Sequence, residues 1–491
     1  MRCYALLLPF AALALAEVPV PKSTLVPVTA TSYPFGSAAT NVEPLNLDRF
    51  GYVEEEFLVS GTANVYDWAA DGALSVKTPN APYTTRILLR RPKSASKFSG
   101  TVIVEVPNTA RRFDWWMLWG YAHPYFMDHG DAYVGVTLAG GLQALKSFDD
   151  ARYGRLSMAN PTPGAACPGA GKGGPSDLEE GLRWDILSQV AAALKSNLAG
   201  QPMTGMKVER IFMATQGGEI VTYINAIHDR AKLANGKPAY DGYMVRNLPA
   251  AARINQCAIA PAAGDARRLI KGVSVPVVNV IAQGELADGG MPNRRPDSDD
   301  PNGRYRSFEI AGAAHIDNWA YVGFPSWEEQ KKAVGGAQGT PEFPFAAPCE
   351  PAIPLSRETL LRYSFDNAFY HLDQWARKGI APPKGRLEVA DGKIVMDENG
   401  LGQGGVRSPW VDTPVFTTVT SSPGPGNCRE LGHHIRFDEA KLVALYGTQK
   451  NYLKKMSEAT DRAVKAGYFL ESDGKKIKED LTKAAPLFDG K

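Results

Sequence analysis

Apolar residues in the middle of the chain occur in two alternating patterns. Short β-branched runs, such as Thr-Val-Ile-Val-Glu-Val at 101–106, are typical of buried strands, whereas residues 178–197 carry apolar side chains at helical spacing. The predicted strands are 52–59, 84–90, 101–106, 132–137, 208–213, 243–246, 275–282 and 304–310, and the predicted helices are 113–128, 178–197, 217–230 and 357–377. This order predicts an α/β fold, with a mostly parallel sheet covered by helices on both faces.

The first sixteen residues have a different pattern. Arg2 precedes an apolar run from 4 to 15, and Ala14-Leu15-Ala16 is the small-x-small sequence that signal peptidase cuts. We therefore expect residues 1–16 to be a signal peptide, with Glu17 as the first mature residue. The mature protein is then secreted or periplasmic.

Three further segments follow the predicted signal peptide. Residues 17–50 are Pro-rich and predict an irregular N-terminal arm. Residues 51–383 hold the strand and helix alternation and form the main domain. Residues 384–491 predict an extension packed on that domain, with a Gly/Pro-rich part and then polar helices between about 437 and 465.

Composition excludes several classes of function. The chain has 491 residues, 44% of them hydrophobic and 22% charged, which are ordinary values for a globular protein. Lys and Arg number 54 against 52 Asp and Glu, so charge gives no case for a nucleic acid or an anionic membrane as partner. No second apolar stretch approaches the length of a membrane span. No phosphate-binding loop opens a helix, and the acidic run at 297–300 misses the calcium-loop spacing, so we expect a small-molecule substrate with no cofactor and no metal.

Cysteine usage agrees with export. Four cysteines remain after the signal peptide, namely Cys167, Cys257, Cys349 and Cys428. In an oxidising compartment they predict two disulfides, with three pairings open. None lies in a C-x-x-C pair, which disfavours a zinc or redox site.

The sharpest candidate for chemistry is the junction Met213-Ala214-Thr215-Gln216-Gly217-Gly218, where a predicted strand runs directly into a helix. It has the context of the G-x-S-x-G turn, the nucleophile elbow of α/β-hydrolases, which exposes a serine nucleophile between strand and helix. We refer to residues 213–218 as the elbow. Thr215 stands at the serine position and Met213 at the first glycine. A threonine hydroxyl can attack a carbonyl, although its methyl group crowds the approach. The alternative is that Thr215 only caps the helix.

Chain order supports the nucleophile. In enzymes with a G-x-S-x-G turn, the three catalytic residues follow the chain order nucleophile, acid, histidine. After Thr215, Glu285 follows the predicted strand 275–282 and His315 follows the predicted strand 304–310. His315 is the predicted general base and Glu285 the predicted orienting acid. Asp288 is close enough in the sequence to compete for that role.

The remaining parts of a hydrolytic site also have candidates. The backbone N–H of Gln216 is one expected oxyanion donor, and the loop containing Asn108, after strand 101–106, is expected to supply the second. Trp115 and Trp116 follow that loop and are candidates for an apolar substrate pocket, with core packing as the alternative.

Several runs resemble a group of α/β-hydrolase-domain proteins, many of them exported from bacteria. They are Gly51-Tyr52-Val53-Glu54-Glu55-Glu56, Ser60-Gly61-Thr62-Ala63, Thr84-Thr85-Arg86-Ile87, Asp114–Tyr121, Gly181-Leu182-Arg183-Trp184-Asp185, Thr215-Gln216-Gly217-Gly218, Ala311-Gly312-Ala313-Ala314-His315 and Gly404-Gly405-Val406-Arg407-Ser408-Pro409-Trp410. The resemblance implies the α/β-hydrolase fold and hydrolase activity. Many relatives carry Ser-Gln at the elbow, so it also implies that Thr215 stands at the nucleophile position.

Two hypotheses follow. In the first, the protein is an exported hydrolase of a carboxylic ester, lactone or amide that works through an acyl-enzyme on Thr215. In the second, it keeps the fold as a non-hydrolytic binding or scaffold module. The sequence leaves the acyl group, the leaving group and the oligomeric state open.

Overall fold

The computed structural model describes residues 17–69, 72–167, 177–247, 250–335, 349, 360–424, 426–483 and 487. The predicted signal peptide lies outside these residues. No helix in the described part of the chain is both long and apolar enough to cross a membrane.

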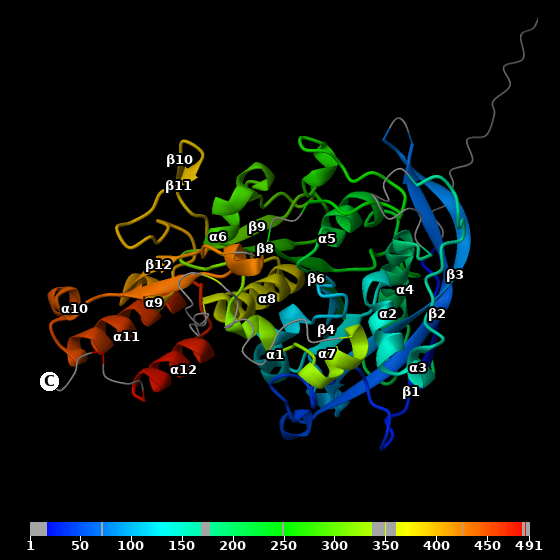
Figure 1. The fold of residues 1–491 in the computed structure, drawn as a ribbon, viewed down its shortest axis with the longest axis horizontal. Helices are drawn as coiled ribbons and strands as arrows, with labels where there is room; N and C mark the ends of the chain where they lie inside the picture. The colour runs from blue at the N-terminus through cyan, green and yellow to red at the C-terminus, as the bar shows by residue number, and fades with distance from the viewer. Residues whose placement is uncertain are drawn as a thin grey trace, which may run out of the picture.

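The core of the fold is a sheet of nine strands among the described residues, in the order β1-β2-β3-β5-β4-β6-β7-β8-β9 (Figure 1). Their bounds are β1 Lys22–Val26, β2 Tyr52–Trp68, β3 Leu74–Pro92, β4 Thr101–Val106, β5 Ala132–Val136, β6 Arg210–Thr215, β7 Gly242–Arg246, β8 Val277–Ala282 and β9 Tyr305–Ile310. The six strands from β5 to β9 in this order are parallel, and β1, β2 and β3 are antiparallel. The predicted fold class, a mostly parallel α/β sheet, is confirmed.

The N-terminal strands differ from the prediction in two ways. β2 and β3 form a hairpin of 17- and 19-residue strands, far longer than the predicted 52–59 and 84–90. A register shift between Ala63 and Val65 breaks the alternation of apolar and polar residues. For this reason the sequence pattern does not predict the outer half of the hairpin. The prediction of an irregular arm is wrong at Lys22–Val26, because this Pro-flanked segment finds a free edge on β2 and becomes β1.

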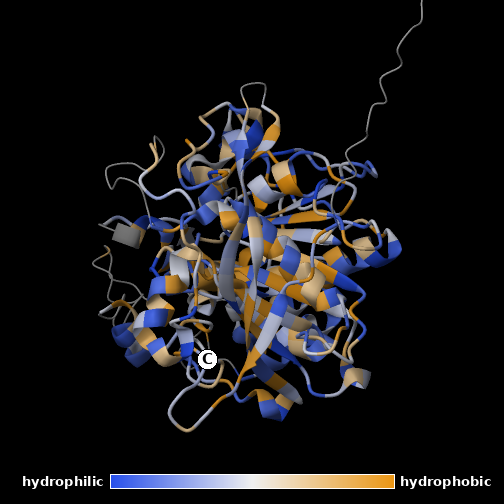
Figure 2. Ribbon diagram, turned by 90° about the vertical axis from the view of Figure 1, so that its right-hand side faces the viewer, coloured by the Kyte–Doolittle hydropathy of each residue, from blue (hydrophilic) through white to orange (hydrophobic). Residues whose placement is uncertain are grey.

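Helices flank the sheet (Figure 1). They are α1 Met117–His129, α2 Ala139–Phe148, α3 Asp150–Tyr153, α4 Arg183–Lys195, α5 Glu219–Thr222, α7 Trp327–Val334 and α8 Leu360–Lys378. Helix α8 packs on β7, β8, β9 and α1, and α4 packs on β2. Hydrophobic residues are concentrated in the central strands and in the helix faces that cover them, which places the core around the sheet (Figure 2).

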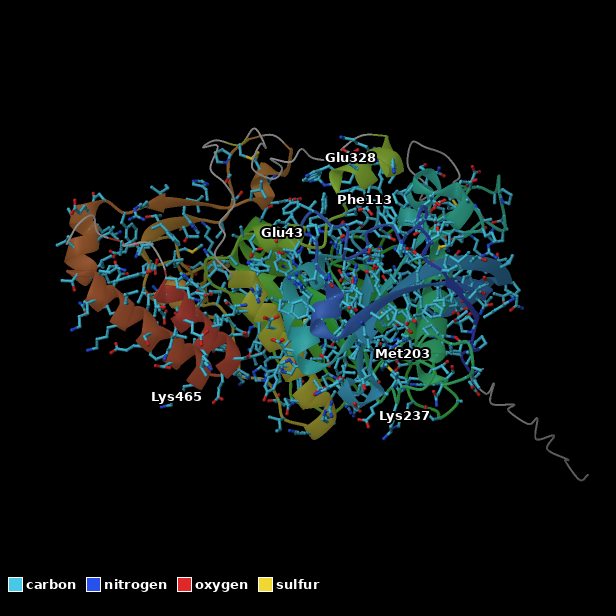
Figure 3. All side chains as sticks on the ribbon, turned by 90° about the horizontal axis from the view of Figure 1, so that it is seen from below. Glu43, Phe113, Met203, Lys237, Glu328 and Lys465 are labelled. Atoms are coloured by element: carbon cyan, nitrogen blue, oxygen red, sulfur yellow. A yellow bond between two sulfur atoms is a disulfide. The ribbon has the colours of Figure 1, made fainter. Side chains whose placement is uncertain are left out.

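The C-terminal extension lies at the opposite end of the molecule from the β2–β3 hairpin, as Lys465 shows in Figure 3. Its elements are β10 Val389–Ala390, β11 Lys393–Ile394, α9 Pro409–Asp412, β12 Phe416–Val419, β13 His433–Arg436, α10 Glu439–Tyr446, α11 Gln449–Lys465 and α12 Glu471–Leu481. Single bridges pair Gly385 with Phe308 and Val406 with Ile310. The extension therefore continues the sheet beyond β9 and braces its outer edge.

Both predicted disulfides form, and they join Cys167 to Cys257 and Cys349 to Cys428. The first ties the loop after α3 to the loop after β7. The second ties the segment before α8 to the C-terminal extension.

Candidate active site

Five polar side chains stand just beyond the carboxyl ends of parallel strands or at their last residue. Asn108 follows β4, Thr215 ends β6, Arg246 ends β7, Glu285 follows β8 and His315 follows β9. Ligands of open α/β sheets bind at this edge.

Glu285 and His315 are in direct contact. The Glu285 Oε1 atom lies 2.6 Å from His315 Nδ1, and Oε2 accepts the backbone N–H of Ala282 at 2.8 Å. Glu285 is buried, in the short helix α6 (Gln283–Glu285). Asp288, the competing acid, is exposed and pairs with Arg429 at 2.5 Å. The geometry therefore selects Glu285 as the partner of His315.

The loop that carries His315 is supported from two sides. Gly312 turns the chain after β9 with φ of 72°, and its N–H donates to Gln283 Oε1 at 2.8 Å. On the other side, Ile316 N–H donates to Glu430 O at 3.1 Å, a bond from the C-terminal extension. The extension thus acts as a support behind the imidazole.

The free nitrogen of His315 faces the elbow. His315 Nε2 lies 3.1 Å from Gln216 Nε2, where the amide N–H donates to the imidazole. In the tautomer that donates Nδ1–H to Glu285, the lone pair of the imidazole is on Nε2. A general base needs this tautomer.

The elbow itself is relaxed. Thr215 is 1% exposed, its Oγ1 accepts the N–H of Gly217 at 3.0 Å, and it makes no hydrogen bond to His315. Neither Thr215 nor Gln216 is among the described residues with positive φ, so the backbone stores no strain of that kind. Gly218 is required for close packing, since a Cβ there would lie 1.8 Å from Ala250 O.

The two predicted oxyanion residues lie beside each other. Gln216 N–H has no hydrogen-bond partner within the described part of the chain, and Asn108 Nδ2 donates to Gln216 Oε1 at 3.4 Å. The backbone N–H of Asn108, however, donates to Trp115 O at 3.2 Å. The Asn108 backbone is therefore not a free donor, and its side-chain amide is the group that faces the site.

The pocket role expected of Trp115 and Trp116 is not what the structure shows. Trp116 is 0% exposed and packs under Gly135, where a Cβ would lie 2.6 Å from the indole. Trp115 donates from Nε1 to Ala320 O at 2.7 Å and stacks on Tyr321. Both side chains belong to the hydrophobic core.

The structure instead has a polar pocket of about 340 Å³ at the same sheet edge. Its charged wall includes Arg183, which donates from Nη1 to Glu219 Oε1 at 3.1 Å. Glu219 begins α5, two residues after Gly217. The pocket is lined by Val106, Pro107, Thr109, Leu138, Ala139, Gly140, Glu180, Arg183, Glu219, Ala251, Ala252, Arg253 and Ala260.

The sequence did not single out Arg246, which is 1% exposed and lies next to the Glu285–His315 pair. Its Nη1 is 3.8 Å from Glu285 Oε1, and Nη2 donates to the backbone oxygen of His315. Asp317 is buried nearby, and burial raises its pKa to about 7 although the charge of Arg246 opposes the shift. The one sequence feature that could have pointed to Arg246 is that a charged residue ends an otherwise apolar predicted strand.

A family model described as "Alpha/beta hydrolase domain" matches residues 17–479, so the chain belongs to the alpha/beta hydrolase domain family. Among curated proteins, no sequence matches the chain.

Solved structures similar to this chain include several esterases. A structure from a study of two fungal esterases of Rhizomucor miehei is 13% identical, covers 57% of this chain and 80% of its own, and has a TM-score of 0.31. Esterase Est22 is 14% identical over 60% of this chain and 80% of its own, with a TM-score of 0.30. The Pyrococcus furiosus esterase Pf2001 is 11% identical over 54% and 83%, with a TM-score of 0.27. The family assignment rests on the family model alone.

Proposed function

We propose that the protein hydrolyses a carboxylic ester, or the related lactone or amide bond. The reaction proceeds through an acyl-enzyme on Thr215. The observation that carries this proposal is the Glu285–His315 pair, 2.6 Å apart, with Nε2 directed at the elbow. Family membership supports a hydrolase of small molecules.

In the proposed reaction, His315 Nε2 takes the proton of Thr215 Oγ1 as that oxygen bonds to the substrate carbonyl carbon. The oxyanion is held by Gln216 N–H, with the Asn108 amide beside it. The bond to the leaving oxygen then breaks, and that oxygen receives the proton from His315. Water repeats the sequence on the acyl-threonine and releases the acid. Glu285 holds the imidazole through Nδ1 and stabilises the imidazolium.

One rearrangement is required before attack. Gln216 Nε2 occupies the hydrogen-bonding position at His315 Nε2, and Thr215 Oγ1 is bonded to Gly217. Substrate binding has to move the Gln216 amide and turn the Thr215 hydroxyl. Since about 1 Å of misplacement costs roughly 10²-fold in rate, we expect a slow enzyme.

We also propose that the protein works outside the cytoplasm, after removal of residues 1–16. The two disulfides support this location, because disulfides persist in oxidising compartments.

The test is hydrolysis of short- and medium-chain acyl esters by the mature protein beside Thr215→Ala, Thr215→Ser and His315→Ala. We expect activity to be lost in both Ala variants and kept or raised in Thr215→Ser, because serine lacks the crowding methyl group. Unchanged activity in Thr215→Ala would overturn the nucleophile assignment.

A second candidate is a non-hydrolytic binding module. One observation favours it: the Gly217 N–H bond to Thr215 Oγ1 is the local bond that a threonine makes when it only caps a turn. If every variant and the wild type, including Thr215→Ser, fail on all esters, this second function is the one supported.

A further inference from the structure

Arg246 is an unusual cation. It ends β7, the strand between those of Thr215 and Glu285, and its side chain is 1% exposed. Its Nε and Nη1 atoms have no hydrogen-bond partner in the described part of the chain. A buried guanidinium that leaves two nitrogens unbonded is costly unless charges nearby compensate for it.

The two groups closest to the guanidinium belong to the candidate active site. Nη1 lies 3.8 Å from Glu285 Oε1, the same oxygen that accepts the His315 Nδ1–H. Nη2 donates to the backbone oxygen of His315. The guanidinium therefore contacts both members of the pair, one through its carboxylate and the other through its backbone.

Two further groups surround the guanidinium. The ring of Tyr121, from α1, lies 5.7 Å from Arg246 Cζ, and the carboxyl of Asp317 lies buried in the loop after His315. The backbone turns sharply after Arg246, since Asn247 has φ of 74° and its N–H donates to Val280 O on β8 at 2.9 Å. The backbone that carries the guanidinium is thus anchored in the sheet.

We infer that Arg246 is a positioning residue, which holds the Glu285 carboxylate and the His315 backbone so that the imidazole is aimed at the elbow. The role rests on the proposed function, in which His315 is the general base. Because its side chain is 1% exposed, we expect Arg246 to act through Glu285 and His315 rather than on the substrate. It acts by supplying one positive charge and one donor that together set the distance between Glu285 and His315.

The test compares Arg246→Met and Arg246→Lys with a matched control. Arg306 is also a buried arginine, bonded to the backbone oxygen of Pro382 at 2.9 Å and 5.6 Å from Trp375, but it lies near the start of β9, away from the site edge. Arg306→Met therefore removes a comparable buried cation without touching the pair.

The first readout needs no enzymatic activity. The downfield proton NMR signal of His315 Nδ1–H, assigned by its loss in His315→Gln, should move or disappear in Arg246→Met. It should be partly kept in Arg246→Lys and unchanged in Arg306→Met. An unchanged signal in Arg246→Met would overturn the inference, whether or not the protein hydrolyses esters.

The second readout separates positioning from binding. On an ester that the wild type hydrolyses, Arg246→Met should lower kcat by at least about tenfold with KM within about twofold, because a shifted base slows chemistry without weakening substrate binding. Arg246→Lys should recover part of kcat. An equal loss of kcat in Arg306→Met would show that the effect is only one of stability. If Arg246→Met does not fold, the Arg246→Lys signal and kcat decide the question.

Discussion

The candidate active site has two parts, the Glu285–His315 pair and the elbow at Thr215, and they differ in how many contacts hold them in place. Glu285 and His315 are held by Gln283, Arg246 and a backbone bond from the C-terminal extension. The elbow at Thr215 has an unstrained backbone, and its hydroxyl is bonded to its own chain at Gly217. In the proposed reaction, the base His315 is therefore in place before substrate binds, whereas the proposed nucleophile Thr215 is not. On this proposal, substrate binding completes the site at the elbow.

The largest effect should come from disrupting the Glu285–His315 pair. His315→Ala should lower kcat/KM for an active ester by about 10²–10⁴-fold, because a positioned general base contributes that much. Steady-state kinetics on the same ester panel would measure the loss. His371→Ala, a histidine of α8 bonded to Gly467 O, serves as the control that should keep activity. Equal activity in His315→Ala and the wild type would contradict the proposed role of His315 as the general base.

The brace behind His315 can be tested through the two disulfides, which close segments of similar length, 90 and 79 residues apart. Loss of either, by paired Cys→Ser changes, should lower the free energy of unfolding by about 2–5 kcal/mol.

Only the Cys349–Cys428 pair neighbours Glu430, whose backbone oxygen holds Ile316. We therefore expect its removal to lower kcat several-fold at temperatures where both variants are folded. Equal kcat in the two variants would show that the extension does not support His315. Chemical unfolding and kinetics on both paired variants provide the comparison.

Asp317 makes the region of the Glu285–His315 pair sensitive to pH. Burial raises its pKa in the folded protein to about 7, above the ordinary 3.8, so the folded state holds this proton more tightly than the unfolded state. The contribution of Asp317 to stability is therefore fully present below about pH 4 and is lost as pH rises through about 7.

Asp317→Asn should remove that dependence. Between pH 4 and 8, the free energy of unfolding of Asp317→Asn should gain on the wild type by an amount on the order of 3 kcal/mol, measured by urea unfolding at each pH. Parallel curves for the two proteins would contradict a pKa of Asp317 raised by burial.

The smallest effect concerns the elbow. Gln216→Met keeps the backbone N–H but removes the amide that lies 3.1 Å from His315 Nε2. A neutral hydrogen bond is worth about 1 kcal/mol, so freeing Nε2 should raise kcat by a factor of about 2–10. A fall in kcat of more than about tenfold would mean that the amide itself holds the substrate oxyanion.

Much of the fold could be predicted from the sequence because buried parallel strands such as 101–106 and 275–282 are continuous apolar runs. The outer half of the β2–β3 hairpin could not, since it is half exposed and a bulge interrupts its alternation. β1 was missed because an edge strand is stabilised by its partner, not by its own pattern.

In the candidate site, chain order placed Glu285 beside His315, since acid and base follow successive strands. Sequence spacing could not choose between Glu285 and Asp288. The structure shows Glu285 in contact with His315, while Asp288 is exposed and pairs with Arg429. Nor could it show that Trp116 is core, or that Gln216 rather than Thr215 contacts His315, because both depend on side-chain packing between distant segments.

The central claim, that Thr215 becomes acylated, has a direct test. The mature protein would be mixed with an activated acetyl ester, quenched with acid on the millisecond to second scale, and digested for peptide mass spectrometry, with Thr215→Ala as the control. We predict one acetyl group on Thr215 during turnover, absent from Thr215→Ala. Turnover with no acetyl group on Thr215, or equal turnover by Thr215→Ala, would contradict it.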